Sequence, residues 1–82
     1  MVTADSVKEG IALGLACEHL EVIGDGQHFQ ALIVSRQFAG RSRVQRHQLV
    51  YAALGERMRE EIHALSMRTL TPDEWQTARS SP

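Results

Sequence analysis

The spacing of apolar positions changes from helical to alternating near the start of the chain. Asp5 or Ser6 can cap a helix, and Glu9 follows Ser6 at the interval of a capping box. Two glycines weaken this helix, which we expect to end within residues 14–16. Residues 19–23 then alternate between polar and apolar side chains, as a half-buried strand does.

A turn and a second strand follow directly. Residues 24–27 read Gly-Asp-Gly-Gln, a group that tolerates positive φ angles. Residues 29–35 form an apolar run rich in β-branched side chains. Two strands joined by so short a turn are expected to form a β-hairpin.

A longer helix is predicted after the hairpin. Ser42 begins it, and mostly apolar side chains recur at three- and four-residue steps, so we expect them to face the sheet. The predicted facing positions are Val44, His47, Val50 or Tyr51, Leu54 and Met58. Gly55 interrupts this pattern, so a break is expected there, with a second helical turn over residues 56–62.

The last part of the chain predicts a strand and a short helix. Residues 63–70 alternate as a third strand, and Thr71-Pro72 followed by two acids is a strong helix start. Trp75 is expected to anchor this helix onto the core.

The predicted order is αββααβα, an α+β arrangement in which helices cover one face of a three-stranded mixed sheet. One domain is expected over residues 1–82, with an ordered core over about residues 4–78.

Composition limits the classes of protein that the chain can represent. Its 82 residues, 43% of them apolar, are enough for one small core. No segment is as long and apolar as a membrane span, and residues 1–16 lack the basic start and apolar run of a signal peptide. The single cysteine, Cys17, cannot form an internal disulfide and fits a reducing compartment. We therefore expect a cytoplasmic protein.

Positive charge is concentrated in the middle of the chain. Residues 1–30 carry one lysine and five acidic residues, whereas residues 31–50 carry four arginines and no acid. These arginines are Arg36, Arg41, Arg43 and Arg46. They can form a solvated basic face, or they can bind nucleic acid weakly, because phosphate binding grows with the number of cations presented together.

The sequence shows no catalytic constellation. Its serines lack a nucleophile-elbow context, and neither GxxxxGK[ST] nor HExxH occurs. The four histidines are not spaced as zinc ligands. We therefore expect a protein that is not an enzyme.

Three segments, in order, resemble signatures of the BolA family. They lie within residues 20–75, and the short turn at residues 24–26 is most similar to the compact IbaG-type bacterial members of that family. The resemblance implies a fold similar to the class II KH domain, which agrees with the predicted element order. The segments are HFQALIVS (residues 28–35) with Phe38-Ala39-Gly40, VQRHQLVY (residues 44–51), and IHALSM (residues 62–67) with LTPDEW (residues 70–75).

The resemblance also implies a partner and a cofactor. BolA-like proteins associate with CGFS-type monothiol glutaredoxins and share a [2Fe-2S] cluster, to which a glutaredoxin cysteine and glutathione also contribute. His63, at the start of the third strand, matches the family's histidine ligand. Imidazole in place of thiolate removes negative charge from a cluster and raises its potential. The alternative for His63 is a strand-edge histidine bonded to a backbone carbonyl.

The second cluster ligand is left open. The family takes it from a longer loop between the first two strands, and here His28, directly after the turn, is the candidate. The alternative is a cluster held by a single histidine with water.

Cys17 is roughly 20 Å from the turn along an extended strand, so we interpret it as a packing residue. His47 shares a helix face with apolar residues and is interpreted as structural.

The leading hypothesis is an iron-sulfur trafficking adaptor. The alternative is a nucleic-acid-binding regulator that uses the four arginines on a KH-like surface and binds DNA weakly. A KH module clamps phosphates with a GXXG loop, of which residues 40–43 supply only one glycine. A third possibility is a protein-binding domain with no cluster. Alone, the chain is expected to be a monomer or a weak homodimer.

Overall fold

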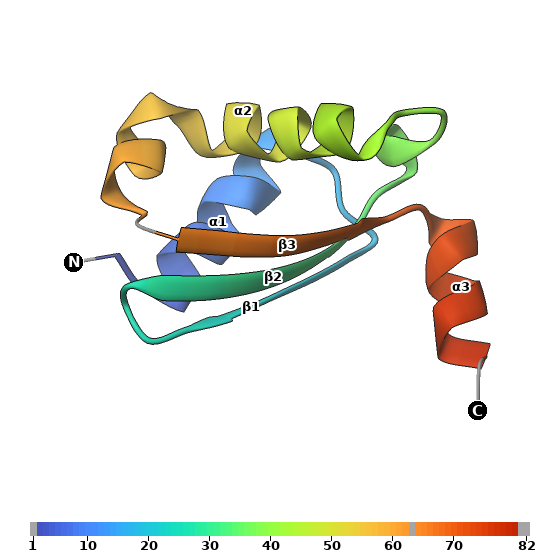
Figure 1. Ribbon diagram of the computed structural model, residues 1–82, viewed down its shortest axis with the longest axis horizontal. Coiled ribbons are helices and arrows are strands. Elements are labelled where there is room, and N and C mark those ends of the chain that lie inside the picture. The colour runs from blue at the N-terminus through green and yellow to red at the C-terminus, as the bar shows by residue number, and fades with distance from the viewer. Residues whose placement is uncertain (1, 63, 81–82) are drawn as a thin grey trace.

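The order of helices and strands agrees with the order that the sequence predicts. The computed structural model describes residues 2–62 and 64–80, apart from the side chains of residues 57–61. Figure 1 shows how the elements follow one another. They are α1 (Ala4–Gly14), β1 (His19–Gly24), β2 (His28–Val34), the 3-10 helix η1 (Arg36–Phe38), α2 (Arg43–Glu61), β3 (Ala64–Leu70) and α3 (Pro72–Ser80). The predicted break in the long helix is confirmed, because Gly55 has φ 81° and ψ 163° inside α2.

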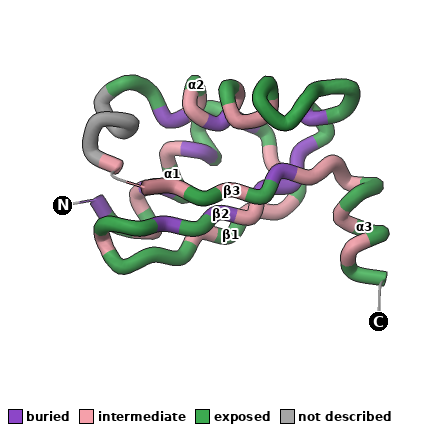
Figure 2. The backbone as a smooth tube through the Cα atoms, viewed as in Figure 1, coloured by how far each residue is buried: buried purple, intermediate pink, exposed green. Residues whose placement is uncertain are grey.

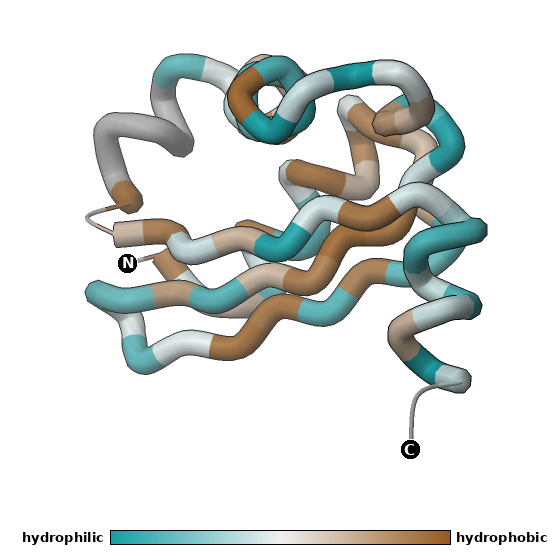
Figure 3. The backbone as a smooth tube through the Cα atoms, turned by 45° about the vertical axis from the view of Figure 1, so that its right-hand side comes forward, coloured by the Kyte–Doolittle hydropathy of each residue, from teal (hydrophilic) through white to brown (hydrophobic). Residues whose placement is uncertain are grey.

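The three strands form one mixed sheet in the order β1-β2-β3. β1 and β2 are antiparallel, with His19 opposite Val34 and Gly24 opposite Phe29. β2 and β3 are parallel, and their register begins with His28 opposite Ala64. α1 and α2 lie on one face of this sheet (Figure 1 and Figure 3). The predicted α+β class with a three-stranded mixed sheet is confirmed, and α1 and α2 are the helices that cover one face.

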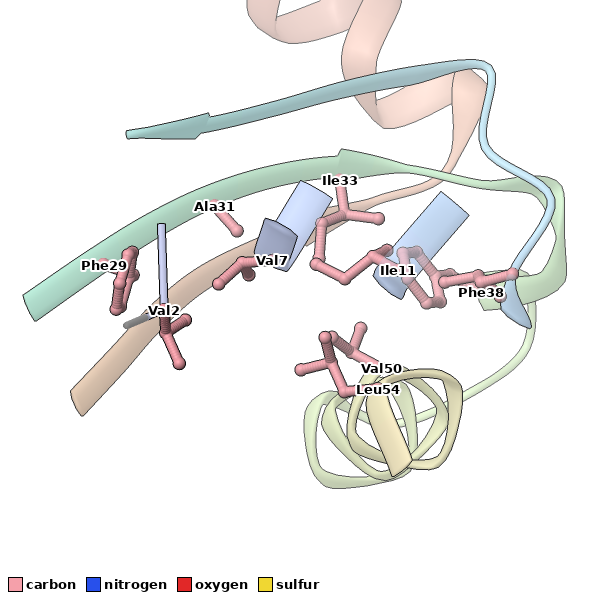
Figure 4. Close-up of a cluster of buried hydrophobic side chains, with 10 residues drawn as sticks. Val2, Val7, Ile11, Phe29, Ala31, Ile33, Phe38, Val50 and Leu54 are labelled. Carbon is pink, nitrogen blue, oxygen red and sulfur yellow. The ribbon is translucent and has the colours of Figure 1, made fainter. Parts of the chain in front are cut away.

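The hydrophobic core lies between the sheet and the helices α1 and α2. Figure 4 shows side chains from these elements pointing into the same space. Val7 and Ile11 come from α1, Phe29 and Ile33 from β2, and Val50 from α2, and all five are almost completely buried. Each such side chain stabilises the fold by about 1.5–3 kcal/mol through its removal from water. The other buried members of this cluster are Val2, Leu15, Ala31, Phe38 and Leu54.

The predicted cap of the first helix is wrong. The side chain of Thr3 accepts a hydrogen bond from the backbone N–H of Ser6 at 3.1 Å, and Ser6 Oγ accepts one from the backbone N–H of Thr3 at 2.9 Å. Ser6 occupies the position where a capping box usually has Glu or Gln. Val2 and Val7, both in the core, stand at the two positions of a hydrophobic staple. The helix is therefore capped by Thr3 rather than by Asp5 or Ser6.

One predicted core position of the second helix is exposed. Val50 and Leu54 are buried as expected, but 66% of Val44 is exposed. An α-helix turns by about 100° per residue, so Val44 lies about 120° from Val50 around the axis. The apolar face is centred on Val50 and Leu54, and Val44 lies beside it.

α1 and α2 approach each other closely at Gly14. A Cβ atom added there would lie 2.6 Å from the Cα of Ala53 and 2.8 Å from its Cβ. Because the nearest of these atoms belongs to the backbone, a larger residue would push the two helices apart. Gly14 therefore permits the helix crossing that closes the core.

The last helix is anchored by Trp75, but not onto the core as predicted. None of the described residues of α3 is buried (Figure 2). The Trp75 ring stacks on the ring of His19, with centroids 4.8 Å apart and planes inclined by 19°. Its other neighbour is the Arg79 guanidinium, 5.5 Å from the ring centroid. His19 alternates along β1 with Leu20, which packs against the core, so the stack lies on the opposite face of the sheet from α1 and α2.

Among the helices described, none combines the length and the apolar character needed to cross a membrane.

Candidate functional site

The β1-β2 turn fixes the position of His28. The carboxylate Oδ1 of Asp25 accepts hydrogen bonds from the backbone N–H groups of Gln27 at 3.0 Å and His28 at 2.9 Å. The backbone N–H of Asp25 donates to the carbonyl of His28 at 3.2 Å. The hydrogen bond from His28, and then that from Gln27, lowers the pKa of Asp25 below its usual value, so the turn carries an ionised carboxylate at neutral pH. Asp25 was missed in the sequence analysis, although an Asp-Gly pair in a turn is a signal for this bonding pattern.

The imidazole of His28 is open to a ligand. Its side chain is 74% exposed, and its Nδ1 lies 4.0 Å from Oδ2 of Asp25, which is similarly exposed. That distance is too long for a hydrogen bond, but it places a carboxylate beside one ring nitrogen. His28 therefore has the accessibility that a metal ligand needs.

The other predicted ligand, His63, lies outside the described residues. Its neighbour Ala64 is the first residue of β3 and is paired with His28 across the parallel strands. The backbone N–H of Ala64 also donates to the carbonyl of Gln27 at 3.2 Å. The start of β3 and the start of β2 are therefore adjacent at one end of the sheet.

Cys17 lies at the opposite end of the sheet from His28. It comes just before His19, which is paired with Val34, whereas His28 begins β2. The two ends of β2, His28 and Val34, are six residue steps apart, which is about 20 Å along a strand. The thiol donates to the carbonyl of Leu15 at 3.3 Å, and burial, with the nearby Glu18 charge, raises its pKa. Cys17 packs against the core and is a poor source of thiolate at neutral pH, in agreement with its interpretation as a packing residue.

The described residues do not form a complete metal site. Among the side chains that the structure describes, no group of three or more His, Cys, Asp or Glu could hold a metal ion. A metal bound at His28 would need ligands from beyond these residues.

Two of the four candidate arginines are held by acidic side chains. Arg36 Nε lies 2.8 Å from Oε1 of Glu18, and this arginine remains largely exposed. The Arg46 guanidinium lies 2.8 Å from Oε1 of Glu74 and donates to the carbonyl of Thr69 at 3.0 Å. Only 14% of the Arg46 side chain is exposed. Arg46 thus joins α2 to β3 and α3 instead of projecting toward solvent.

The other two arginines differ from this pair. Arg41 Nε donates to the carbonyl of Gln37 at 3.0 Å, and neither Arg41 nor Arg43 forms an ion pair within the described part of the chain. Nearby His47 is half-buried, and burial, followed by the Arg43 charge, lowers its pKa. The basic block of the sequence therefore divides into two paired and two unpaired arginines.

The Arg46–Glu74 pair is expected to contribute to stability. Arg46→Gln should lower the free energy of unfolding by about 1–2 kcal/mol, because it removes charge-assisted hydrogen bonds at a mostly buried guanidinium. Arg43→Gln, at an exposed position, should change it by less than about 0.5 kcal/mol. Urea unfolding of both variants measures the difference. Equal losses would contradict a structural role for Arg46.

The same pair should also affect unfolding by acid. The side-chain hydrogen bond from Arg46, and then the backbone N–H of Thr71, lowers the pKa of Glu74 in the folded state. The resulting stabilisation is present above the ordinary carboxyl pKa and is lost as the pH falls through the lower folded value. Stability should therefore fall less steeply with acid in Arg46→Gln than in the unaltered chain.

Comparison with known proteins agrees with this fold. A family model described as BolA-like protein matches residues 11–74. The chain is 44% identical to Protein BOLA2 of Arabidopsis thaliana over 80 residues, which cover 92% of this chain and 85% of the relative. It is 44% identical to acid stress protein IbaG of Escherichia coli K12 over 62 residues, 74% of each protein. A solved Bol-like protein from Babesia bovis is 35% identical with a TM-score of 0.85, covering 96% of this chain and 95% of that one.

The mixed sheet, its helices and the hairpin with an exposed histidine thus define a small α+β protein of a known class. The chain belongs to the BolA family. The resemblance predicted from the sequence, including that to IbaG-type members, is confirmed.

Two further relatives carry names that bear on function. The DNA-binding transcriptional regulator BolA of Haemophilus influenzae is 44% identical over 52 residues, 63% of this chain and 50% of the relative. The BolA domain of SufE1 from Arabidopsis thaliana is 32% identical with a TM-score of 0.74, covering 87% of this chain and 93% of that domain. One of these relatives is thus named as a DNA-binding transcriptional regulator, and the other is a domain of the protein named SufE1.

Proposed function

We propose that the chain is a non-catalytic adaptor that shares a [2Fe-2S] cluster with a CGFS-type monothiol glutaredoxin, and that His28 and His63 are its ligands. The observation that carries this proposal is the pairing of the exposed His28 with Ala64, the residue after His63. Membership of the BolA family supports it.

The strand pairing supports joint ligation by the two histidines. His63 directly precedes Ala64 in the sequence, and Ala64 is paired with His28 across strands about 5 Å apart. We therefore expect two ligands that are far apart in the sequence to meet at this end of the sheet.

The donor chemistry suits a cluster that is divided between two proteins. Neutral imidazoles can replace two thiolates on one iron, which removes negative charge and raises the reduction potential. A glutaredoxin cysteine and glutathione would supply the thiolates on the other iron. The Asp25 carboxylate would hold the backbone of His28 in the turn while the imidazole stays exposed to the cluster. In this arrangement the chain binds and orients the cluster, which is the cargo, and performs no bond-making step.

The structure favours this proposal over nucleic-acid binding through the four arginines. Arg36 and Arg46 are occupied by Glu18 and Glu74, which halves the positive charge predicted for that surface. Because affinity for nucleic acid depends on how many phosphates are neutralised, the loss of two cations weakens the alternative.

Anaerobic reconstitution with a CGFS-type monothiol glutaredoxin, iron, sulfide and glutathione tests the proposal. The mixture should give visible absorption and circular dichroism spectra that differ from those of the glutaredoxin reconstituted alone. Size-exclusion chromatography should show the chromophore eluting with both proteins. Identical spectra and separate elution of the two proteins would rule the adaptor function out.

A further inference from the structure

The sheet face opposite α1 and α2 is uncovered except at its α3 end. Leu20 and Val22 of β1 pack against the core, so the residues that alternate with them point to the other face, and the same holds along β2 and β3. These outward residues form rows across the strands. The row at the α3 end contains His19 and Val34, and Trp75 stacks on His19 there. The next two rows, which we call the open rows, are Glu21–Leu32–Arg68 and Ile23–Gln30–Ser66.

The open rows surround a hollow of about 420 Å³, and all six of their residues line it. Leu32, on the central strand, is half-buried, and Ile23 is 64% exposed. The other four residues of the open rows are exposed. The face therefore combines an apolar centre with polar and charged side chains that can reach another molecule.

The two charged residues of the open rows lie on opposite sides of this face. Glu21 is on β1 and Arg68 is on β3, with Leu32 between them on β2. Among the side chains that the structure describes, none forms an ion pair or a hydrogen bond with Arg68, and Glu21 is paired only with His19. An exposed guanidinium without an acidic partner can bind a carboxylate of another molecule.

We propose that a second copy of this chain docks on the open rows, so that the two sheets lie face to face. In this dimer the twofold axis runs along β2 between the sheets, and β1 of each copy faces β3 of the other. Glu21 then meets Arg68 of the other copy, twice in each dimer, and Leu32 meets its own counterpart. Sheets that pack face to face are commonly aligned in this way, about 10 Å apart.

The second open row is complementary to itself in the same arrangement. Ile23 is large and apolar, and it faces the small Ser66 of the other copy, so the two layers can interdigitate. Gln30 faces its own counterpart, and each amide can both donate and accept a hydrogen bond. An axis across the strands would instead place each strand over its own copy and keep Glu21 away from Arg68. The charges therefore select the axis along β2.

The dimer is expected to be weak. Paired strands are about 5 Å apart, so the open rows of three strands offer far less than the roughly 800 Å² per partner of a standard interface. We expect a dissociation constant on the order of 0.1–1 mM. The proposal does not depend on the iron-sulfur function, because it concerns the chain alone, without metal or glutaredoxin.

Sedimentation and NMR measurements on the full chain alone test the proposal. The weight-average mass should rise from that of one chain toward that of two as the concentration approaches the dissociation constant. The backbone amide signals that move on dilution should belong to the open rows and their neighbours on the strands. Signals from the exposed sides of α1 and α2 should stay in place.

Charge reversal gives a sharper test of the arrangement. Arg68→Glu and Glu21→Arg should each weaken self-association by about tenfold or more, because two attractions in each dimer become repulsions. Mixed with each other, the two variants should associate at least as tightly as the unaltered chain, because every contact again joins opposite charges. Titration of one isotopically labelled variant with the other, unlabelled, measures this association.

Two control variants separate the docking surface from net charge. Lys8→Glu and Glu9→Arg make the same changes of charge at exposed positions of α1, and they should leave the dissociation constant unchanged. Unfolding curves of dilute protein should show that all the variants are folded. Glu21→Arg removes the contact with His19, whereas Arg68 has no ion pair to lose among the described side chains, so Arg68→Glu tests the proposal even if Glu21→Arg does not fold.

Three outcomes would overturn the inference. The first is a mass and a set of amide signals that do not change with concentration up to the millimolar range. The second is a set of dilution shifts confined to α1 or α2. The third is a failure of the two folded charge-reversal variants to associate when they are mixed.

Discussion

Replacing His63 with alanine is expected to remove the spectrum of the cluster shared with the glutaredoxin. The imidazole would be lost from one iron, and neither water nor a backbone carbonyl provides the same ligand field or charge. The visible circular dichroism of the reconstituted mixture should then revert to that of the glutaredoxin alone. An unchanged heterocomplex spectrum would show that His63 is not a ligand.

His28→Ala tests the second ligand in the same way. If both imidazoles bind, this variant should also lose the shared spectrum, whereas a cluster held by a single histidine and water would keep a modified form of it. Asp25→Asn keeps a side-chain oxygen that can accept the two hydrogen bonds of the turn and leaves the His28 ring in place, so it should weaken cluster retention less than His28→Ala does. A chelator competition followed by absorbance measures these differences.

His19→Ala is the matched control for these histidine variants. His19 is also on a strand of the sheet, but it is paired with Val34 at the end far from His28. It stacks on Trp75, so its loss should alter the packing of α3 and the fluorescence of the only tryptophan. It should not alter the cluster spectrum. Loss of the spectrum in His19→Ala as well would indicate that the domain, and not a ligand, had been disturbed.

The features of the fold that the sequence predicted correctly depend on local signals. The hairpin follows from a Gly-Asp-Gly turn between two apolar segments, and the last helix follows from Thr71-Pro72 and two acids. The break at Gly55 follows from the positive φ angle that glycine adopts easily. In each case the residues that determine the structure are within a few positions of one another.

The features that the sequence did not predict depend on contacts between distant segments. Arg46 looked available for phosphate, but the folded chain brings Glu74 to it from α3. Trp75 was expected on the core, but β1 provides His19 as its stacking partner. The register that places His28 beside Ala64 also arises only when β3 pairs with β2. The sequence therefore predicted which residues are candidates for the site, but it did not predict how they are arranged.

Ile33→Ala is expected to cause a large loss of stability. Ile33 is 0% exposed in the middle of the core, so its truncation should lower the free energy of unfolding by about 2–5 kcal/mol. That loss is a large part of the roughly 5–15 kcal/mol that stabilises an ordinary domain. Ile23→Ala is the matched control, because Ile23 is on the neighbouring strand β1 but is 64% exposed. Both substitutions lower strand propensity equally, so the difference between their urea midpoints isolates the effect of burial. Similar shifts for the two variants would contradict the placement of the core on the face of the sheet that α1 and α2 cover.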